Sequence, residues 1–110
     1  KTGGLSGPCI RPIAVRMVWE VARKVRIPVL GIGGILDASH ALEFLVAGAS
    51  AVQVGTACFL NPRAPLDVLD GIEAFMRKEK LAKMKDIIGS VHGTHSYTAT
   101  CIDNCRISCI

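Results

Sequence analysis

The strongest constraint on the fold of this chain is a regular alternation of helical and extended patterns between residues 12 and 79. Apolar residues at spacings of three and four indicate amphipathic helices, and short apolar runs rich in β-branched residues indicate strands buried on both faces. These patterns predict helices over 12–25, 38–47 and 66–79, and strands over 27–32 and 49–54. Because a helix that connects two buried strands makes them parallel, the predicted fold class is α/β.

The predicted helices have defined faces and ends. The apolar faces are Ala14, Met17, Val18, Val21, Ala22 and Val25 in the first helix, Ala41, Leu42, Leu45 and Val46 in the second, and Leu66, Leu69, Ile72, Phe75 and Met76 in the third. Asp37 is a suitable N-cap for the second helix and Gly48 a suitable stop. Gly71 weakens the third helix by about 1 kcal/mol relative to alanine. A final short helix is predicted over residues 79–89.

Composition narrows the class of protein. Half of the 110 residues are hydrophobic and the mean hydropathy is +0.40, which is more apolar than an isolated small domain and suggests a piece of something larger. The net charge of +4 is scattered along the chain, so no nucleic-acid partner is predicted. No apolar stretch is long enough for a membrane span or a signal peptide. These observations predict a soluble cytoplasmic protein whose five cysteines are reduced thiols.

Two glycine-rich sites follow the predicted strands. Residues 31–34 contain three glycines after the first strand, and Gly55 and Thr56 follow the second. Parallel strands bring their carboxyl ends to one rim, where backbone without Cβ atoms lets an anion approach N–H groups, and a following helix N-terminus adds positive charge. Thr56 adds a hydroxyl group. The pattern favours a phosphate ligand, although each glycine could instead serve only a tight turn.

Two common phosphate motifs are excluded. After Gly31 and Gly33, the third glycine of G-x-G-x-x-G falls on Leu36, so a dinucleotide fingerprint is absent. No G-x-x-x-x-G-K-[ST] loop is present either. In (β/α)8 barrels, a phosphate is often held by the loops after the last two strands and by a short extra helix. That arrangement suits the two glycine-rich sites.

Three motifs in order resemble dihydroorotate dehydrogenases. They are "GGLSGPCIRPIAVRMV", "IPVLGIGGILDASHALEFLVAGASAVQVGTA" and "DGIEAF", and the resemblance covers residues 1–92. The "GGLSG" wording looks like the class 1B catalytic subunit. The resemblance implies the C-terminal third of a TIM (β/α)8 barrel that binds flavin mononucleotide (FMN).

The same resemblance implies roles for individual residues. Gly33, Gly34, Gly55 and Thr56 would bind the FMN phosphate, and Gly7 would lie against the flavin, with Ser6 shaping that loop. The family oxidises dihydroorotate to orotate in de novo pyrimidine (UMP) biosynthesis, an oxidoreductase reaction in which the cofactor carries the redox chemistry. The family's catalytic base is a loop cysteine upstream of this segment, so no catalytic residue is assigned here.

The resemblance also implies partners. They are the remaining N-terminal barrel segment, an iron–sulfur and FAD electron-transfer subunit that passes electrons to NAD, and a second copy in a homodimer. Because two strands cannot form a closed barrel, the isolated chain is expected to be inactive. Two alternatives remain open: another phosphate-binding barrel enzyme without flavin, and an inactive fragment or partner-binding module.

Other reactive residues receive structural interpretations. Cys9 and Cys58 are interpreted as packing cysteines, Trp19 and Met17 as core, and Arg63 as a solvated loop residue. His40 is expected to form hydrogen bonds at a helix start, and His92 has no visible carboxylate partner. Residues 93–110 depart from the family and are expected to be poorly ordered. Their cysteines, Cys101, Cys105 and Cys109, match no standard zinc or iron–sulfur spacing, so no metal is assigned.

Overall fold

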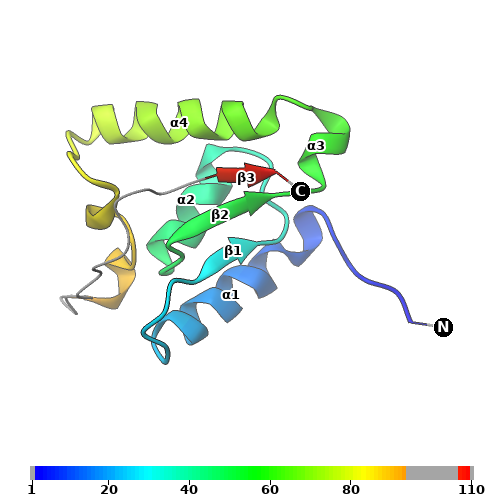
Figure 1. The fold of residues 1–110 in the computed structure, drawn as a ribbon, viewed down its shortest axis with the longest axis horizontal. Coiled ribbons are helices and arrows are strands. Elements are labelled where there is room, and N and C mark those ends of the chain that lie inside the picture. Colours follow the sequence, from blue (N-terminus) through cyan, green and yellow to red (C-terminus); the bar gives the residue numbers. More distant parts are fainter. Residues whose placement is uncertain (1, 94–106, 110) are drawn as a thin grey trace.

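A computed structural model describes residues 2–93 and 107–109 and contains a sheet of three parallel strands in the order β1-β2-β3. The strands are β1 (Leu30–Ile32), β2 (Ala51–Val54) and β3 (Ile107–Cys109), the helices are α1 (Arg11–Ala22), α2 (Ala38–Val46), α3 (Ala57–Leu60) and α4 (Ala64–Lys78), and three 3-10 turns are η1 (Pro8–Ile10), η2 (Met84–Asp86) and η3 (Ser90–His92). Figure 1 shows α2 behind the sheet, with α1 and α4 at its two sides. The predicted α/β class with parallel strands is confirmed.

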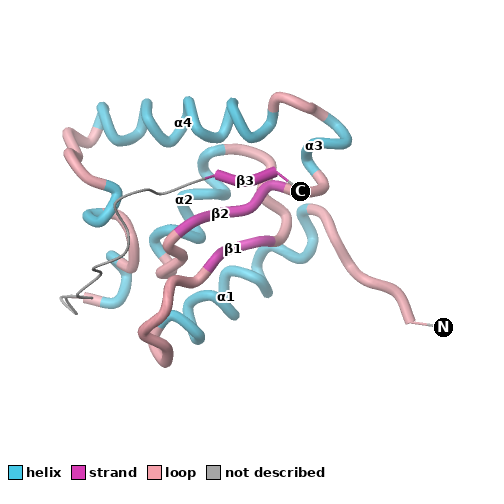
Figure 2. The backbone as a smooth tube through the Cα atoms, in the orientation of Figure 1, coloured by secondary structure: helices cyan, strands magenta, loops and turns pink. Residues whose placement is uncertain are grey.

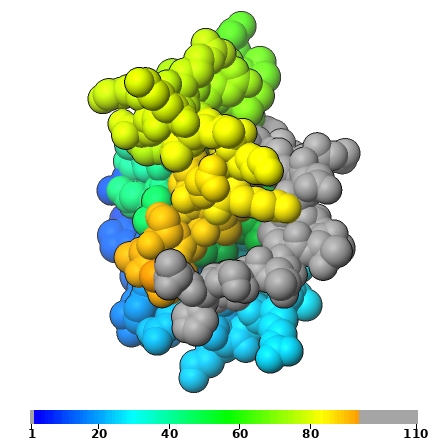
Figure 3. Space-filling view, turned by 90° about the vertical axis from the view of Figure 1, so that its left-hand side faces the viewer, coloured from blue at the N-terminus to red at the C-terminus, as the bar shows by residue number. Residues whose placement is uncertain are grey.

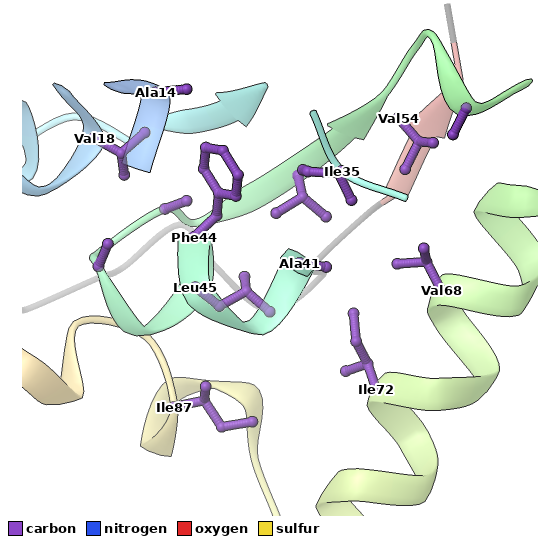
Figure 4. Close-up of a cluster of buried hydrophobic side chains, with 14 of the residues drawn as sticks. Ala14, Val18, Ile35, Ala41, Phe44, Leu45, Val54, Val68, Ile72 and Ile87 are labelled. Carbon is purple, nitrogen blue, oxygen red and sulfur yellow. The ribbon is translucent and has the colours of Figure 1, made fainter. Parts of the chain in front are cut away.

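The hydrophobic core lies between the sheet and the three long helices. Its fully buried large side chains are Phe44, Leu45, Val52, Val54 and Val68. Figure 4 shows the α2 side chains in the middle of this cluster, with residues of α1 on one side and residues of α4 on the other. The central βαβ unit is therefore the scaffold that sets the positions of the loops that follow β1 and β2.

The predicted apolar faces are only partly buried. In α1, Ala14, Val18 and Ala22 are buried, whereas Met17 is 59% exposed and Val21 is 43% exposed, so the interpretation of Met17 as core is wrong. In β1 only the central glycine is buried, and Leu30 and Ile32 are 56% and 49% exposed. The prediction that this strand is buried on both faces is also wrong, because the described helices cover only one face of the sheet.

The ends of α2 follow the sequence prediction closely. Asp37 has extended backbone angles, and its carboxylate accepts a hydrogen bond from the His40 amide at 3.1 Å, which is the geometry of an N-cap. After the last turn, Gly48 adopts a φ of +114°, which ends the helix. The predicted stripe omitted Phe44, although this residue is completely buried.

Helix α4 contains a glycine for a packing reason. A Cβ atom on Gly71 would lie 2.4 Å from the Cβ of Ala38 in α2, so the glycine allows the two helices to approach closely. The same helix buries Val68 and Ile72 but leaves Leu66 52% exposed and Leu69 42% exposed, which departs from the predicted face.

The close approach of Gly71 and Ala38 predicts that the effect of Gly71→Ala on stability changes sign when Ala38 is also replaced. In the wild-type background, Gly71→Ala is expected to destabilise the chain by about 1–2 kcal/mol, because overpacking outweighs the gain in helix propensity. In the Ala38→Gly background the same substitution is expected to stabilise it, because the opposing methyl group is gone. Urea unfolding followed by the fluorescence of Trp19, the single tryptophan, measures both effects. Stabilisation in both backgrounds would contradict the close approach.

The segment after α4 closes the end of the sheet at which the strands begin. No α-helix forms over residues 79–89; the segment is built from turns and η2, so the predicted final helix is wrong. Ile87 is buried in the core, and the Gly89 amide donates to the Leu45 carbonyl at 2.9 Å. Figure 3 shows this segment, in yellow and orange, packed below α4. Among the described residues, no helix is long and apolar enough to cross a membrane.

Candidate phosphate-binding site

The loop after β1 is shaped by two glycines with positive φ angles. Gly33 has a φ of +130° and Gly34 a φ of +72°, conformations that residues with a Cβ rarely adopt. A Cβ on Gly34 would lie 2.6 Å from the carbonyl oxygen of Gly7 and 3.1 Å from the Cα of Pro8. A Cβ on Gly33 would lie 2.9 Å from that of Ala14. The loop backbone therefore packs directly against the N-terminal segment and the start of α1.

Gly7 belongs to the same cluster. It is buried, has a φ of +85° and precedes η1, where its carbonyl accepts a hydrogen bond from the Ile10 amide at 3.2 Å. Two segments that are separated in the chain by the whole of α1 are thus brought into backbone contact. The structure brings Gly7, Gly33 and Gly34 together in one cluster.

Gly55 and Thr56 lie at the end of the neighbouring strand. The register pairs Ile32 of β1 with Gln53 of β2, so the residues that follow both strands lie at one edge of the sheet (Figure 2). Within the part of the chain that the structure describes, a Cβ on Gly55 would meet nothing within 4 Å, and Thr56 is exposed. The Thr56 hydroxyl forms no capping hydrogen bond with the single-turn helix α3. This half of the rim is therefore open, with a hydroxyl group available to a ligand.

Helix N-termini contribute less positive charge to this rim than the sequence suggested. The N-terminus of α2 is occupied by the Asp37 carboxylate, which also accepts a hydrogen bond from the Ser39 hydroxyl at 2.7 Å. A carboxylate at that position opposes an anion instead of attracting one. Helix α3 has only four residues, so its dipole is small. An anion at this rim would be held by loop amides and by the Thr56 hydroxyl.

Comparison with known proteins decides the family. The family model described as dihydroorotate dehydrogenase matches residues 1–76, which include all five residues of the candidate site. The chain belongs to the dihydroorotate dehydrogenase family. It is 56% identical over 91 residues to the dihydroorotate dehydrogenase B (NAD(+)) catalytic subunit of Lachnoclostridium phytofermentans, and 57% identical over 89 residues to that of Thermodesulfovibrio yellowstonii. These matches cover 83% and 81% of the chain.

The structural comparison agrees with the family. The crystal structure of dihydroorotate dehydrogenase from Eimeria tenella in complex with ferulenol matches with a TM-score of 0.77 and 27% identity, over 84% of this chain and 26% of that one. The chain spans about 30% of the length of the curated relatives that it matches. The resemblance of the three motifs to dihydroorotate dehydrogenases, including the type B subunit, is supported.

The histidines of this dihydroorotate dehydrogenase segment have structural contacts. His40 accepts a hydrogen bond from the Leu36 amide at Nδ1, at 3.3 Å, which confirms its role at the helix start. The Nε2 atom of His92 donates to the Ala47 carbonyl at 2.8 Å, and the His92 ring lies 5.8 Å from that of Trp19. Trp19 is half-buried against the core, so its predicted role is confirmed in part.

The cysteines and Arg63 have contacts of a structural kind. Cys9 is exposed and its thiol donates to the Ser6 carbonyl at 3.4 Å, so its interpretation as a packing cysteine is wrong. Cys58 is half-buried against the core, as predicted, and its thiol lies 3.6 Å from the Val54 carbonyl oxygen. Arg63 is exposed and lies 3.9 Å from the Asp67 carboxylate, as expected of a loop arginine. Within the described residues, no group of three side chains could hold a metal ion. Cys101 and Cys105 lie outside the described residues, as does most of the segment expected to be poorly ordered.

Sequence reasoning missed the residues that support the glycine loop. A Cβ atom on Gly33 would contact the side chains of Ile10 and Ala14, and a Cβ atom on Gly34 would lie 3.0 Å from the Arg11 side chain. Arg11 is itself held by an ion pair with Glu43 of α2 at 3.4 Å. The only sequence signal was the position of these residues directly after the "GGLSG" motif.

Proposed function

We propose that this chain is the C-terminal part of the (β/α)8 barrel of a type B dihydroorotate dehydrogenase, and that it binds the phosphate of FMN. The observation that carries the proposal is the direct backbone contact between Gly7 and Gly34 beside the open Gly55–Thr56 turn. In barrels of this class, phosphates lie at the loops after the last two strands and at a short extra helix, the position that α3 occupies after β2.

The residues present fit a phosphate group. Gly34 sits where any Cβ would collide with backbone, and Gly55 leaves open space for a ligand to approach the main chain. The Thr56 hydroxyl is exposed and free of the helix that follows. Gly33, Gly34, Gly55 and Thr56 would hold the phosphate, and Gly7 would lie against the flavin. When bound, FMN would supply the acceptor for the two electrons that dihydroorotate loses.

The exposed apolar surface supports a larger barrel. Leu30 and Ile32 project from the uncovered face of β1, and Ile13 and Met17 form an exposed stripe on α1. Apolar side chains in these positions would be buried if further strands and helices continued the barrel. The remaining barrel segment would also supply the catalytic base, since no catalytic residue is assigned in this chain.

The proposed reaction is the oxidation of dihydroorotate to orotate in pyrimidine biosynthesis, in the cytoplasm. Because the similar relatives are named catalytic subunits of an NAD(+) enzyme, we extend the proposal to a second, iron–sulfur and FAD subunit that passes electrons to NAD, and to a homodimer. Neither nucleic acid nor membrane is a proposed partner.

Co-expression tests this proposal. The chain is produced together with the part of the Lachnoclostridium phytofermentans catalytic subunit that precedes the matched region. The purified complex is expected to show the visible absorbance of flavin and to oxidise dihydroorotate, and the chain alone is expected to do neither. A complex that binds a phosphorylated ligand without flavin would support a different barrel enzyme, and the absence of any complex would support an inactive or partner-binding module.

The Thr56 hydroxyl gives a second prediction. Thr56→Val removes one hydrogen bond to a charged phosphate and is expected to weaken FMN binding by the co-expressed complex about tenfold. Thr56→Ser keeps the hydroxyl and should bind FMN nearly as wild type does. Because the Thr56 side chain is exposed and forms no capping hydrogen bond with α3, neither variant should change the urea midpoint of the chain. Equal FMN affinity in the two variants, measured by titration of the flavin-free complex, would remove Thr56 from the site.

A further inference from the structure

The C-terminal strand β3 lies outside the region that matches the family. The family model ends at residue 76 and β3 begins at Ile107, so the family pattern does not account for this strand. Nevertheless β3 pairs in parallel with β2 over its whole length, with Val52 opposite Ile107 and Val54 opposite Cys109. In the figures it lies between β2 and α4 (Figures 1 and 2).

The position of β3 has a consequence for barrel closure. In the sheet order β1-β2-β3, one edge of β2 is paired with β1 and the other with β3, so β2 has no free edge. A closed parallel barrel needs both edges of every strand for barrel neighbours, and the strand after the last one in sequence is the first strand of the barrel. That first strand would run parallel to β2, as β3 does.

We propose that β3 occupies the edge of β2 that the first strand of a complete barrel would take, so that the pairing of β3 with β2 and the closure of the barrel exclude each other. This inference rests on the proposed barrel function. The partner that displaces β3 is a polypeptide that offers a parallel strand, namely the segment that completes the barrel. Strand β3 is then an intramolecular competitor. It protects the edge of β2 from non-specific pairing and lowers the apparent affinity of the chain for the segment that completes the barrel.

Proline substitutions in β3 test the pairing. Successive amides of a strand point to opposite sides, so replacing both Ile107 and Ser108 removes a donor that faces β2, whichever of the two it is. The double variant Ile107→Pro/Ser108→Pro is expected to accelerate amide hydrogen exchange in β2 about tenfold, without change in α2. The control Ile107→Val/Ser108→Val keeps both donors and should exchange as wild type does. Unchanged exchange in the proline variant would overturn the inference.

Co-expression with the barrel-completing segment tests the exclusion itself. The proline variant is expected to yield about tenfold more complex at limiting partner than the wild-type chain or the valine control. Equal yields from all three chains would overturn the exclusion while leaving the barrel proposal intact. If exchange in β2 rises as expected but no chain forms a complex, the barrel proposal is wrong and the exclusion fails with it, whereas β3 stands as an edge strand.

Discussion

Phe44→Ala is expected to remove a large part of the free energy of unfolding of the chain. Phe44 is completely buried in the last turn of α2, and its Cδ1 atom lies 2.6 Å from the point where a Cβ on Gly31 would sit, so the ring rests directly on the backbone of β1. Removing a buried phenylalanine ring costs about 3–5 kcal/mol, from lost burial and from the cavity that remains. Small domains are stable by about 5–15 kcal/mol, so the loss is a large part of the total.

Phe59→Ala is the matched control for this prediction. Phe59 is 89% exposed in α3, so the same chemical change there is expected to alter stability by less than about 0.5 kcal/mol. Circular dichroism and Trp19 fluorescence during urea unfolding give both free energies of unfolding. A difference of less than about 1 kcal/mol between the two variants would show that the ring of Phe44 is not a core element.

The central βαβ unit could be predicted from the sequence because its signals are local. Asp37 before an apolar stripe and Gly48 after it mark the two ends of α2, and both residues act in the structure as predicted. Because β1 and β2 are parallel, the glycines that follow the two strands lie at the same edge of the sheet. The order of strands and glycines along the chain is therefore enough to locate the candidate site at this edge.

Tertiary contacts account for what the sequence could not predict. Helical spacing placed Val18 and Met17 on one apolar face, but it cannot tell which part of that face packs within this chain and which part lies open. Gly71 looked like a weakness in a helix, because the Ala38 methyl group that explains it belongs to a different helix, α2. The contact between Gly7 and Gly34 is equally long-range, and neither residue carries a side chain that could signal it.

Gly34→Ala is expected to separate the loop after β1 from the loop that contains Gly7. It is also expected to abolish most FMN binding by the co-expressed complex. The new methyl group would need a φ of +72°, which costs an alanine about 1–2 kcal/mol, and it would lie 2.6 Å from the Gly7 carbonyl oxygen. That obstacle is backbone, so the loop containing Gly7 must move. Loss of one or two hydrogen bonds to a charged phosphate corresponds to a reduction in affinity of at least about tenfold.

Gly93→Ala separates backbone strain from loss of the site. Gly93 has the same φ of +72°, but a Cβ there would meet no atom of the described residues within 4 Å. Both variants should lose stability from the positive φ, yet only Gly34→Ala should accelerate hydrogen exchange over residues 8–11 and weaken FMN titration of the flavin-free complex. If Gly34→Ala bound FMN as tightly as Gly93→Ala does, the contact between the two loops would not be what holds the phosphate. The family assignment would stand in that case, because it depends on the sequence match and not on this contact.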